Sequence, residues 1–383
     1  MELQDSLTTK FERTFTLPKS GIQSHASNLL ILDNGDTLCV WFSGTQEGMS
    51  DISIFLSRMN NGEETWSEPI RMSSNEGRSD QNPMLFHAPN GDIWLMYTSQ
   101  DGGNQDTAIV ECRISHDEGK TWDDQKVLFN GEQGVFIRQP IVVTDSGEWL
   151  LPIFHCVVKN DGKPWYGSYD YSAVRVSNDQ FKTFKEYEVP NSLGCVHMDI
   201  EKLKSGRYIG LFRSRWADNI YRSYSEDGKT WTEPEKTELP NNNASIQATV
   251  LGNGDLVMVF NDSSAKDATS RRTSLYSDGL EDKDADEDSD VPRAFWGAPR
   301  APITVAISED EGKTWPYKKN LAEGDGYALT NDSKNKKNRE FSYPSIKAAK
   351  NGNIDVTFTY FRQKIAFVEL TESWIKSKKT VNE

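Results

Sequence analysis

The sequence predicts an all-β fold, a six-bladed β-propeller whose blades are four-stranded antiparallel sheets. Three observations lead to it: a glycine turn that recurs six times, a second turn signature that follows most copies, and a length of 383 residues. Repeats of a regular period indicate such architectures, because each unit buries its faces only against its neighbours. We therefore expect residues 1–383 to form one propeller domain, in which closure of the ring protects the sheet edges.

The glycine turns read as β-hairpins. In the first, the sequence Asp-Asn-Gly-Asp at residues 33–36 separates apolar, β-rich runs at residues 29–32 and 38–42, as a tight hairpin turn does. The six turn glycines are Gly35, Gly91, Gly147, Gly206, Gly254 and Gly352. Most of the intervals between them are roughly 50 to 60 residues, a length that suits the four strands of one blade.

The interval from Gly254 to Gly352 is about twice as long, yet it holds only one further copy of the second signature. We therefore expect an acidic insertion at about residues 263–298, in the fifth-to-sixth blade region, rather than a lost repeat. Residues 277–290 (SDGLEDKDADEDSD) are too acidic and too poor in apolar side chains to pack, which predicts a solvated excursion. Cation binding or an oligomer contact is the alternative for this run.

The second signature is a turn of the form S-x-D-x-G-x-T-W. Residues 115–122 and 308–315 fit it without a mismatch, and residues 57–66, 177–184 and 225–231 are imperfect copies. Its physics is that of a turn: Asp and Ser side chains cap backbone amides, Gly takes a positive φ, and Trp packs between neighbouring sheets. Asp117 and Asp310 are therefore expected to be structural turn residues.

With these motifs, about residues 20–370 of the sequence resemble the Asp-box (bacterial neuraminidase repeat) proteins of the sialidase superfamily. The resemblance implies a six-bladed propeller with the Asp boxes between the third and fourth strands of each blade. It also implies a site in which three arginines hold the carboxylate of a sugar. A tyrosine nucleophile activated by a glutamate and an aspartate that protonates the leaving group complete that site.

Polar residues stand in one register, about nine residues before each hairpin glycine, where a buried strand would otherwise carry Val or Ile. In a propeller the inner strands line the axis, so these side chains are expected to converge. Six polar groups in the same register indicate a ligand site. The residues in this register are His25, Gln81 with Asn82, Arg138, His197, Gln247 and Tyr343.

The resemblance assigns roles to several of these positions. Tyr343, in the sequence Ser-Tyr-Pro, matches the nucleophile, and Arg213 and Arg300 match two carboxylate-binding arginines. Two arginines can clamp a carboxylate through bidentate hydrogen bonds. Arg138 is a candidate for the third arginine from a different blade, and Arg362 either faces the channel or caps a strand.

The chain departs from the sialidase pattern at two positions. His25 stands where the first arginine is expected, and His197 stands where the activating glutamate is expected. The acid is expected in the loop after residues 41–42, where Glu47 and Asp51 are both candidates. Asp51 is equally suited to capping the strand that follows.

These residues fit three functions. The first is an exo-acting glycoside hydrolase on a carboxylate-bearing sugar, in which Tyr343 attacks, His197 takes the phenol proton and Glu47 or Asp51 is the acid. The second is a uronate-directed lyase, in which His25 or His197 removes the C5 proton and Tyr343 protonates the departing oxygen. The third is a non-catalytic glycan-binding propeller with Trp296 as a sugar platform. The partner is in each case an acidic oligosaccharide or glycoside.

Composition argues against other classes. The net charge is −15 and no long basic run is present, which disfavours nucleic acid as a partner. The acidic and basic start of the chain and the absence of a long apolar run predict a cytoplasmic protein that does not bind membranes. The four cysteines are far apart and are expected to be reduced, and no ligand spacing for a metal or cofactor is visible. The sequence leaves a homo-oligomer open.

Overall fold

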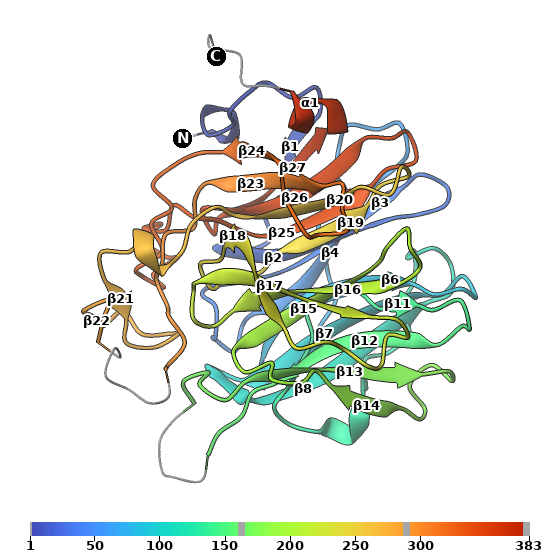
Figure 1. Ribbon diagram of the computed structural model, residues 1–383, viewed down its shortest axis with the longest axis horizontal. Coiled ribbons are helices and arrows are strands. Elements are labelled where there is room, and N and C mark those ends of the chain that lie inside the picture. Colours follow the sequence, from blue (N-terminus) through green and yellow to red (C-terminus); the bar gives the residue numbers. More distant parts are fainter. Residues whose placement is uncertain (1, 160–164, 286–291, 378–383) are drawn as a thin grey trace.

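The structure, a computed structural model, describes residues 2–159, 165–285 and 292–377. Six antiparallel sheets, each built around four strands, succeed one another in chain order, and the prediction of a six-bladed propeller is confirmed (Figure 1). Each of the six glycine turns joins the first strand of a blade to the second, and Gly35 in the first of them has a φ of 89°. Within the described residues, no helix has the length and apolar content needed to cross a bilayer.

The strands of the first three blades, from the axis outward, are β2 (Gln23–Ile31), β3 (Thr37–Gly44), β4 (Ser53–Met59) and β5 (Ile70–Arg71); β6 (Ser79–His87), β7 (Ile93–Asp101), β8 (Asn104–Ser115) and β9 (Lys126–Val127); and β10 (Val135–Phe136) with β11 (Val142–Val143), β12 (Trp149–His155), β13 (Tyr171–Ser177) and β14 (Lys185–Glu188). In the last three blades they are β15 (Cys195–Lys202), β16 (Tyr208–Ser214), β17 (Asn219–Ser225) and β18 (Glu235–Pro240); β19 (Gln247–Val250), β20 (Leu256–Asn261), β23 (Ile303–Ser308) and β24 (Tyr317–Ala322); and β25 (Phe341–Ala348), β26 (Ile354–Tyr360), β27 (Lys364–Leu370) and β1 (Thr14–Thr16). Short helices η1 (Leu3–Asp5), η2 (Phe129–Gly131), η3 (Ala265–Asp267) and α1 (Glu372–Lys376) complete the regular structure.

The ring is closed by the two ends of the chain. Strand β1 is the outermost strand of the sixth blade and pairs antiparallel with β27, so that Thr14 lies opposite Val368. The blue start and the red end of the chain therefore lie side by side in Figure 1. This pairing covers the outer edge of the last blade, which would otherwise expose unpaired backbone groups.

The core lies between neighbouring blades. Val257 and Val305 of the fifth blade pack with Val356 and Phe358 of the sixth in one buried cluster. A sheet that is covered on both faces reads as a nearly continuous apolar run. This explains why the inner three strands of most blades are rich in Val, Ile, Leu and Phe, and why the rare polar residues in them stand out.

The turn at residues 115–122 lies between β8 and β9, between the third and fourth strands of the second blade. Asp117 accepts hydrogen bonds from the backbone N–H of Thr121 at 2.8 Å and of Lys120 at 3.1 Å, and from the Thr121 hydroxyl at 2.6 Å. The bond from the Thr121 hydroxyl and the neighbouring amides hold the pKa of this carboxyl well below its usual range. Asp117 therefore holds a turn together far from the axis.

Replacing Asp117 with alanine is expected to lower Tm by a few degrees while kcat/KM stays within a factor of about two, because the turn loses its acceptor and the axis is untouched. Thermal unfolding and a steady-state assay would check both values. Asp145→Ala, an exposed hairpin aspartate whose side chain is 88% accessible, is the control and should change neither. A drop in activity larger than the loss of stability would contradict a purely structural role.

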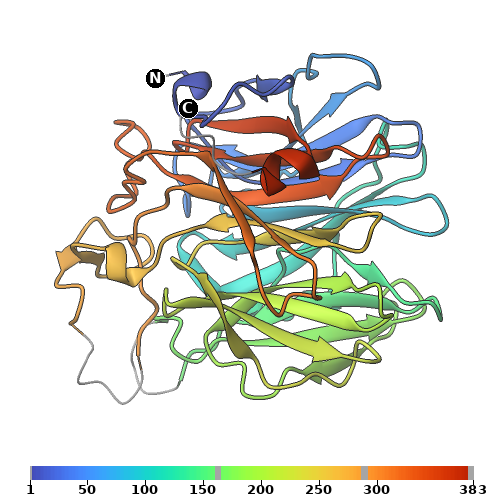
Figure 2. The same cartoon turned by 45° about the horizontal axis from the view of Figure 1, so that its top comes forward.

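The long interval between β20 and β23 holds the inserted segment. Its described part contains η3 and a two-stranded sheet of β21 (Arg271–Arg272) and β22 (Leu280–Glu281). Figure 2 shows this segment projecting from one side of the propeller. Residues 278–280 and 284–285 of the acidic run are exposed, whereas residues 286–291 lie outside the described residues. The segment that precedes the run, residues 271–276, turns back toward the axis.

Candidate active site

Four inner strands carry the same irregularity at the entrance to the axis. The pairing register of β2, β6, β15 and β25 with the next strand shifts at His25, Gln81, Val196 and Ser342. The residue in the bulge takes a positive φ, which costs a non-glycine residue on the order of 1 kcal/mol or more. These residues are Ala26 (57°), Asn82 (50°), His197 (53°) and Tyr343 (51°). A bulge changes the direction in which side chains point. Here the bulge occurs at the corresponding position of the inner strand in four blades.

Tyr343 lies at the centre of a buried polar cluster. The Arg213 side chain donates a hydrogen bond from Nη1 to the Tyr343 hydroxyl at 2.6 Å and from Nε to Asn243 Oδ1 at 2.7 Å. The guanidinium groups of Arg138, Arg213 and Arg300 all lie within 5.7 Å of the Tyr343 ring centroid. Three positive charges therefore surround the Tyr343 ring. No carboxylate of the described residues hydrogen-bonds the Tyr343 hydroxyl.

The two predicted histidines flank this tyrosine. The His25 ring centroid is 4.3 Å from that of Tyr343, and the His197 centroid is 5.9 Å from it. Arg213 Nη1 is 3.4 Å from His197 Nε2. Because a guanidinium only donates, His197 Nε2 must carry a lone pair and Nδ1 the proton. That Nδ1, like Nε2 of His25, is buried without a hydrogen-bond partner.

Both imidazoles are neutral at ordinary pH. Burial lowers the pKa of His25 well below its ordinary value of 6.5, and the charges of Arg362 and Arg300 lower it further. Burial and the charge of Arg213 lower the pKa of His197 in the same way. A neutral imidazole accepts a proton, so both rings are suited to act as bases.

These depressed pKa values predict a loss of stability in acid. The unfolded chain protonates both histidines below about pH 6.5 whereas the folded chain does not, so their stabilising contribution is present above about pH 6.5 and lost as the pH falls. The double variant His25→Gln/His197→Gln is expected to lose less stability than the wild type between about pH 7 and about pH 5, by up to about 1.4 kcal/mol per unit per histidine. Chemical unfolding across this range measures the difference. Parallel curves would show that the folded and unfolded chains bind protons at these two imidazoles equally, against the prediction.

A second part of the cluster is a chain of ion pairs through Glu340. Its Oε1 accepts hydrogen bonds from Arg362 Nε at 2.9 Å, from Arg300 Nη1 at 3.2 Å and from the Ser342 hydroxyl at 2.8 Å. Burial alone would raise the pKa of this carboxyl, but Arg362 and Arg300 lower it to about 2. Glu340 is therefore a permanent anion that orders two of the predicted arginines.

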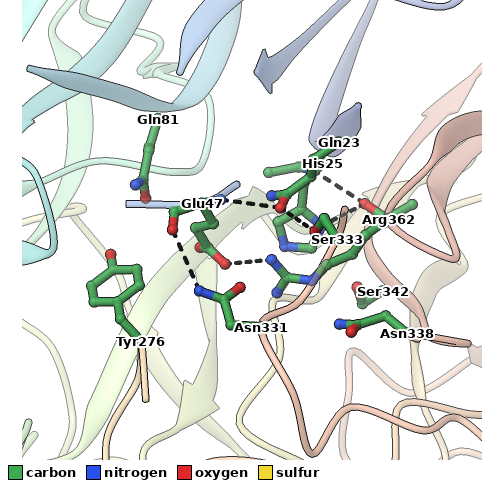
Figure 3. A network of polar contacts seen from close by, with 12 residues as sticks. Gln23, His25, Glu47, Gln81, Tyr276, Asn331, Ser333, Asn338, Ser342 and Arg362 are labelled. Carbon is green, nitrogen blue, oxygen red and sulfur yellow. Dashed lines mark hydrogen bonds and ion pairs between the residues drawn. The ribbon is translucent and has the colours of Figure 1, made fainter. Parts of the chain in front are cut away.

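Glu47 ends the same chain on the other side. Its carboxylate accepts a hydrogen bond from Arg362 Nη1 at 2.5 Å, and its backbone N–H donates to Gln23 Oε1 at 3.0 Å (Figure 3). Gln23 in turn accepts from the Ser333 hydroxyl at 2.6 Å. The structure therefore brings Glu47 into the cluster. Asp51, the other acid candidate, is exposed and accepts hydrogen bonds from the hydroxyl and N–H of Thr45 in its own loop.

The inserted segment supplies two residues that sequence reasoning missed. Arg272 of β21 is 3% exposed, and its Nε has no hydrogen-bond partner. Burial and the charges of Arg300 and Arg362 lower the pKa of Arg272 to about 10. Tyr276 lies across Glu47 from Arg362 in Figure 3, with burial and Glu47 raising its pKa. A signal was present: two adjacent arginines open an otherwise acidic insertion.

Glycines make room for this inserted tyrosine. A Cβ atom built on Gly48 would lie 2.8 Å from the Tyr276 ring, and one built on Gly103 would lie 2.9 Å from it. Such contacts do not occur between real atoms, so any larger residue at either position would displace the ring. The Tyr276 hydroxyl accepts a hydrogen bond from Gln100 Nε2 at 3.1 Å. The insertion is thus docked onto the propeller by contacts with the first and second blades.

The cluster carries more positive than negative charge. Two carboxylates, Glu47 and Glu340, are the acidic partners that pair with its guanidinium groups among the described residues. Arg138, Arg213 and Arg272 have none, and Arg138 is bound instead by backbone carbonyls such as that of Ser27. A buried cation is costly unless it is paired, so the remaining two guanidinium groups, those of Arg213 and Arg272, indicate that an anion completes the site. The five guanidinium groups are those of Arg138, Arg213, Arg272, Arg300 and Arg362.

Two predicted ligand-binding residues join blades instead. Arg138 donates to the backbone oxygen of Ser27 at 2.8 Å and lies near the carbonyls of Ala26, Pro83, Tyr343 and Pro344. Gln247 accepts from the backbone N–H of Ile346 at 2.8 Å and donates to Gln139 at 2.8 Å. Their polar groups are used by the inner strands of other blades, which the shared register alone could not reveal.

The other predicted ligand-binding residues, Trp296, Gln81 and Asn82, pack around the axial cluster. Trp296 is 3% exposed, and its ring lies 5.4 Å from the Arg215 guanidinium, which pairs with Asp170 at 2.7 Å. Gln81 donates to the Ser79 hydroxyl at 3.0 Å, and Asn82 occupies the bulge of β6. Trp296 thus has its ring packed in the wall, with little surface free for a sugar to stack on.

Comparisons with known proteins agree with this architecture. A profile of the BNR repeat-like domain family matches residues 35–356. Among solved structures, a protein of unknown function from Dyadobacter fermentans DSM 18053 is 15% identical, with a TM-score of 0.69 over 94% of this chain and 98% of that one. The Hadza microbial sialidase Hz136 is 16% identical, with a TM-score of 0.67 over 92% of this chain and 66% of that one. The NanB sialidase from Streptococcus pneumoniae is 12% identical, with a TM-score of 0.66 over 98% of this chain and 73% of that one. No curated protein sequence matches. At such identities the likeness concerns the fold.

Proposed function

Because this chain belongs to the BNR repeat-like domain family, we propose that its axial cluster is the active site of a sialidase-like glycoside hydrolase, exo-acting on a carboxylate-bearing sugar. The observation that carries the proposal is the pair of buried guanidinium groups, Arg213 and Arg272, without a carboxylate partner among the described residues. A sugar carboxylate supplies the missing negative charge, and Arg300 stands beside it. Bidentate contact with a guanidinium also fixes the orientation of the sugar ring.

Tyr343 is the nucleophile in this mechanism. Arg213 Nη1 donates a hydrogen bond to the phenol oxygen, and the lone pair of His197 Nε2 faces the same Arg213 nitrogen. When the guanidinium moves onto the substrate carboxylate, Nε2 becomes available to take the phenol proton. The tyrosine oxygen then bonds to the anomeric carbon and the glycosidic oxygen departs. A water molecule cleaves the tyrosyl-sugar bond in a second step.

Glu47 is the group that protonates the leaving oxygen. Its support is that it is the acid candidate that lies in the cluster, where it pairs with Arg362. A substrate carboxylate that engages Arg362 competes with Glu47 for that guanidinium. Asp51 remains with its own loop, because both of its oxygens are held by Thr45.

A uronate lyase is the second candidate, and one observation favours it. The Tyr343 hydroxyl lacks a carboxylate partner among the described residues, while two neutral imidazoles flank its ring. In that reaction His25 or His197 removes the C5 proton of a uronic acid, and Tyr343 donates its proton to the departing oxygen. The same arginines neutralise the carboxylate, which acidifies the C5 proton.

One assay separates these functions. The protein is incubated with aryl glycosides of carboxylated sugars and with acidic oligosaccharides, while reducing ends and the ultraviolet band of an unsaturated uronate are followed. Release of reducing sugar without the band supports the hydrolase, and appearance of the band supports the lyase. If neither product forms but calorimetry detects binding, the site belongs to a glycan-binding propeller. The Tyr343→Phe variant is the blank for both reactions.

A further inference from the structure

A polar cavity lies at the opposite end of the inner strands from the axial cluster, where the hairpin turns of the sixth and first blades meet. It encloses about 250 Å³. Its wall comes from β26 and β27 of the sixth blade, from the turns around Gly35 and Lys350, and from the residues that follow β4. The polar residues of the wall are Arg13, Asp33, Asn34, Asn60, Asn61, Lys350, Asn351, Asp355 and Glu369. None of these residues belongs to the axial cluster.

The central residue of this cavity departs from the repeat. Asp355 is the second residue of β26 and lies opposite Lys347 in β25 and Glu369 in β27. The strand pairings place an apolar, buried residue at the same position in each of the other five blades. These residues are Leu38, Trp94, Leu150, Ile209 and Val257, all at most 4% exposed. Asp355 is equally buried, at 4%.

The following blade departs from the repeat at the same place. At three junctions the turn glycine of the next blade packs on this apolar residue: a Cβ on Gly119 would lie 3.0 Å from Leu38, on Gly228 2.4 Å from Leu150, and on Gly312 2.5 Å from Ile209. At the junction of the sixth and first blades the corresponding turn is the stretched one at residues 57–66. Its Gly62 has open space around it. The contact between a turn glycine and an apolar side chain, which fills this place at the three other junctions, is therefore missing here. The cavity occupies the space that is left.

Among the described residues around the cavity, no cationic side chain forms an ion pair with Asp355. Arg13 pairs with Glu369 at 3.0 Å and Lys350 pairs with Asp33 at 3.1 Å, whereas Asp355 Oδ1 has no hydrogen-bond partner. Burial and the neighbouring Glu369 raise the pKa of Asp355 to about 7, against a smaller opposite effect of Arg13. In the described part of the chain no three His, Cys, Asp or Glu side chains gather as they would around a metal ion. The carboxylate and amide oxygens around the cavity are therefore better suited to accept hydrogen bonds from N–H groups than to coordinate a metal ion.

We propose that the cavity beside Asp355 binds a small organic ammonium ion, whose N–H groups donate to Asp355 and to the surrounding oxygens. A primary ammonium carries one charge, as the free carboxylate requires, and its three donors match the amide and carboxylate oxygens of the wall. The volume accommodates a compound of a few heavy atoms. Two independent losses of the repeat pattern, that of an apolar residue and that of a regular turn, coincide at this cavity.

Ethanolamine is the probe that tests this site, with ethylene glycol as its neutral counterpart. Saturable shifts in protein NMR spectra are expected with ethanolamine at about pH 8 and a Kd on the order of millimolar, as for any ligand of so few atoms. Asp355→Asn should weaken binding at least about tenfold, which is the loss expected for a buried charged hydrogen bond. Asp145→Asn, at the hairpin of the third blade, should bind as the wild type does.

The pH dependence gives a separate readout. Ethanolamine stays cationic near neutral pH while Asp355 must lose its proton to hold it, so affinity should rise about tenfold or less between about pH 6 and about pH 8, with release of a proton on binding. The other charged groups that face Asp355 are Arg13, which pairs with Glu369, Lys350, which pairs with Asp33, and Lys347, which lies opposite Asp355 on β25. Asp355→Leu, which restores the residue type of the other blades, should stay folded and bind nothing.

Four outcomes would overturn the proposal. These are equal binding of ethylene glycol, equal saturation by potassium chloride, binding that Asp355→Asn leaves intact, and no saturable shift up to about 50 mM ethanolamine. The site is remote from the axial cluster, so the result does not depend on whether the glycosidase assay succeeds.

Discussion

Tyr343→Phe is expected to lower kcat/KM for an aryl glycoside of a carboxylated sugar by about 10²-fold or more, the size seen when a positioned catalytic group is lost. The variant removes the oxygen that Arg213 contacts at 2.6 Å and leaves the ring in place. That ring is held by His25 on one face and by the surrounding arginines, so Tm should change little. A matched pair of measurements, steady-state kinetics and thermal unfolding, separates loss of chemistry from loss of structure.

The leaving group refines this test. If Tyr343 is the nucleophile, an aryl glycoside with a good leaving group should lose activity as strongly as one with a poor leaving group, because bond formation to the sugar is abolished in both. If Tyr343 is an acid, as in the elimination, the loss should be largest for a poor leaving group. Wild-type turnover in the variant would remove Tyr343 from the mechanism altogether.

Arg272→Met is expected to lower kcat/KM by about 10²-fold or more and at the same time to raise Tm by a few degrees. The reason is that Arg272 is buried without an acidic partner and is repelled by Arg300 and Arg362. Its positive charge therefore lowers the free energy of unfolding of the protein without substrate. Methionine fills a similar volume without that charge. Activity falls because the substrate carboxylate loses a guanidinium that is poised for it.

The neighbouring residue provides a control of opposite sign. Arg271 donates to the carbonyl of Ala294 at 3.0 Å and pairs with Glu281 at 3.4 Å, so Arg271→Met should lower Tm. The two substitutions at adjacent positions of one strand are therefore expected to change Tm in opposite directions. A general loss of structure in the insertion would lower Tm in both variants. A fall of Tm in Arg272→Met, similar to that in Arg271→Met, would mean that Arg272 serves the fold and does not await an anion.

The fold was accessible from the sequence because its signals are local. A hairpin glycine and the apolar runs beside it are encoded within about a dozen residues, and repetition made the six copies reinforce one another. The register of polar residues before each turn predicted that Tyr343, His25 and His197 would converge, and their rings do lie close together because the same bulge recurs in the strands that carry them. Local periodicity thus predicted both the ring and the level at which the site stands.

The rest of the site depends on contacts that periodicity does not encode. Arg272 and Tyr276 belong to an insertion without a repeat, and their docking is decided by Gly48 and Gly103 in other blades. Glu340 precedes the polar register by only a few residues, but its role follows from Arg300 and Arg362, which are distant in sequence. Conversely, Gln247 fits the register and yet serves the neighbouring blade. The position of a residue on a strand predicts where its Cβ atom lies. It does not predict which group its polar atoms will hydrogen-bond or pair with.

The pairing of β1 with β27 also determines when the ring of blades can close during synthesis. During synthesis the first strand emerges early and must wait, unpartnered, until the last strand of the same sheet has left the ribosome. Tyr343 and Arg362 emerge just as late. Nascent fragments that stop short of them therefore have neither a closed ring of blades nor a complete axial cluster, and they expose an unpaired sheet edge.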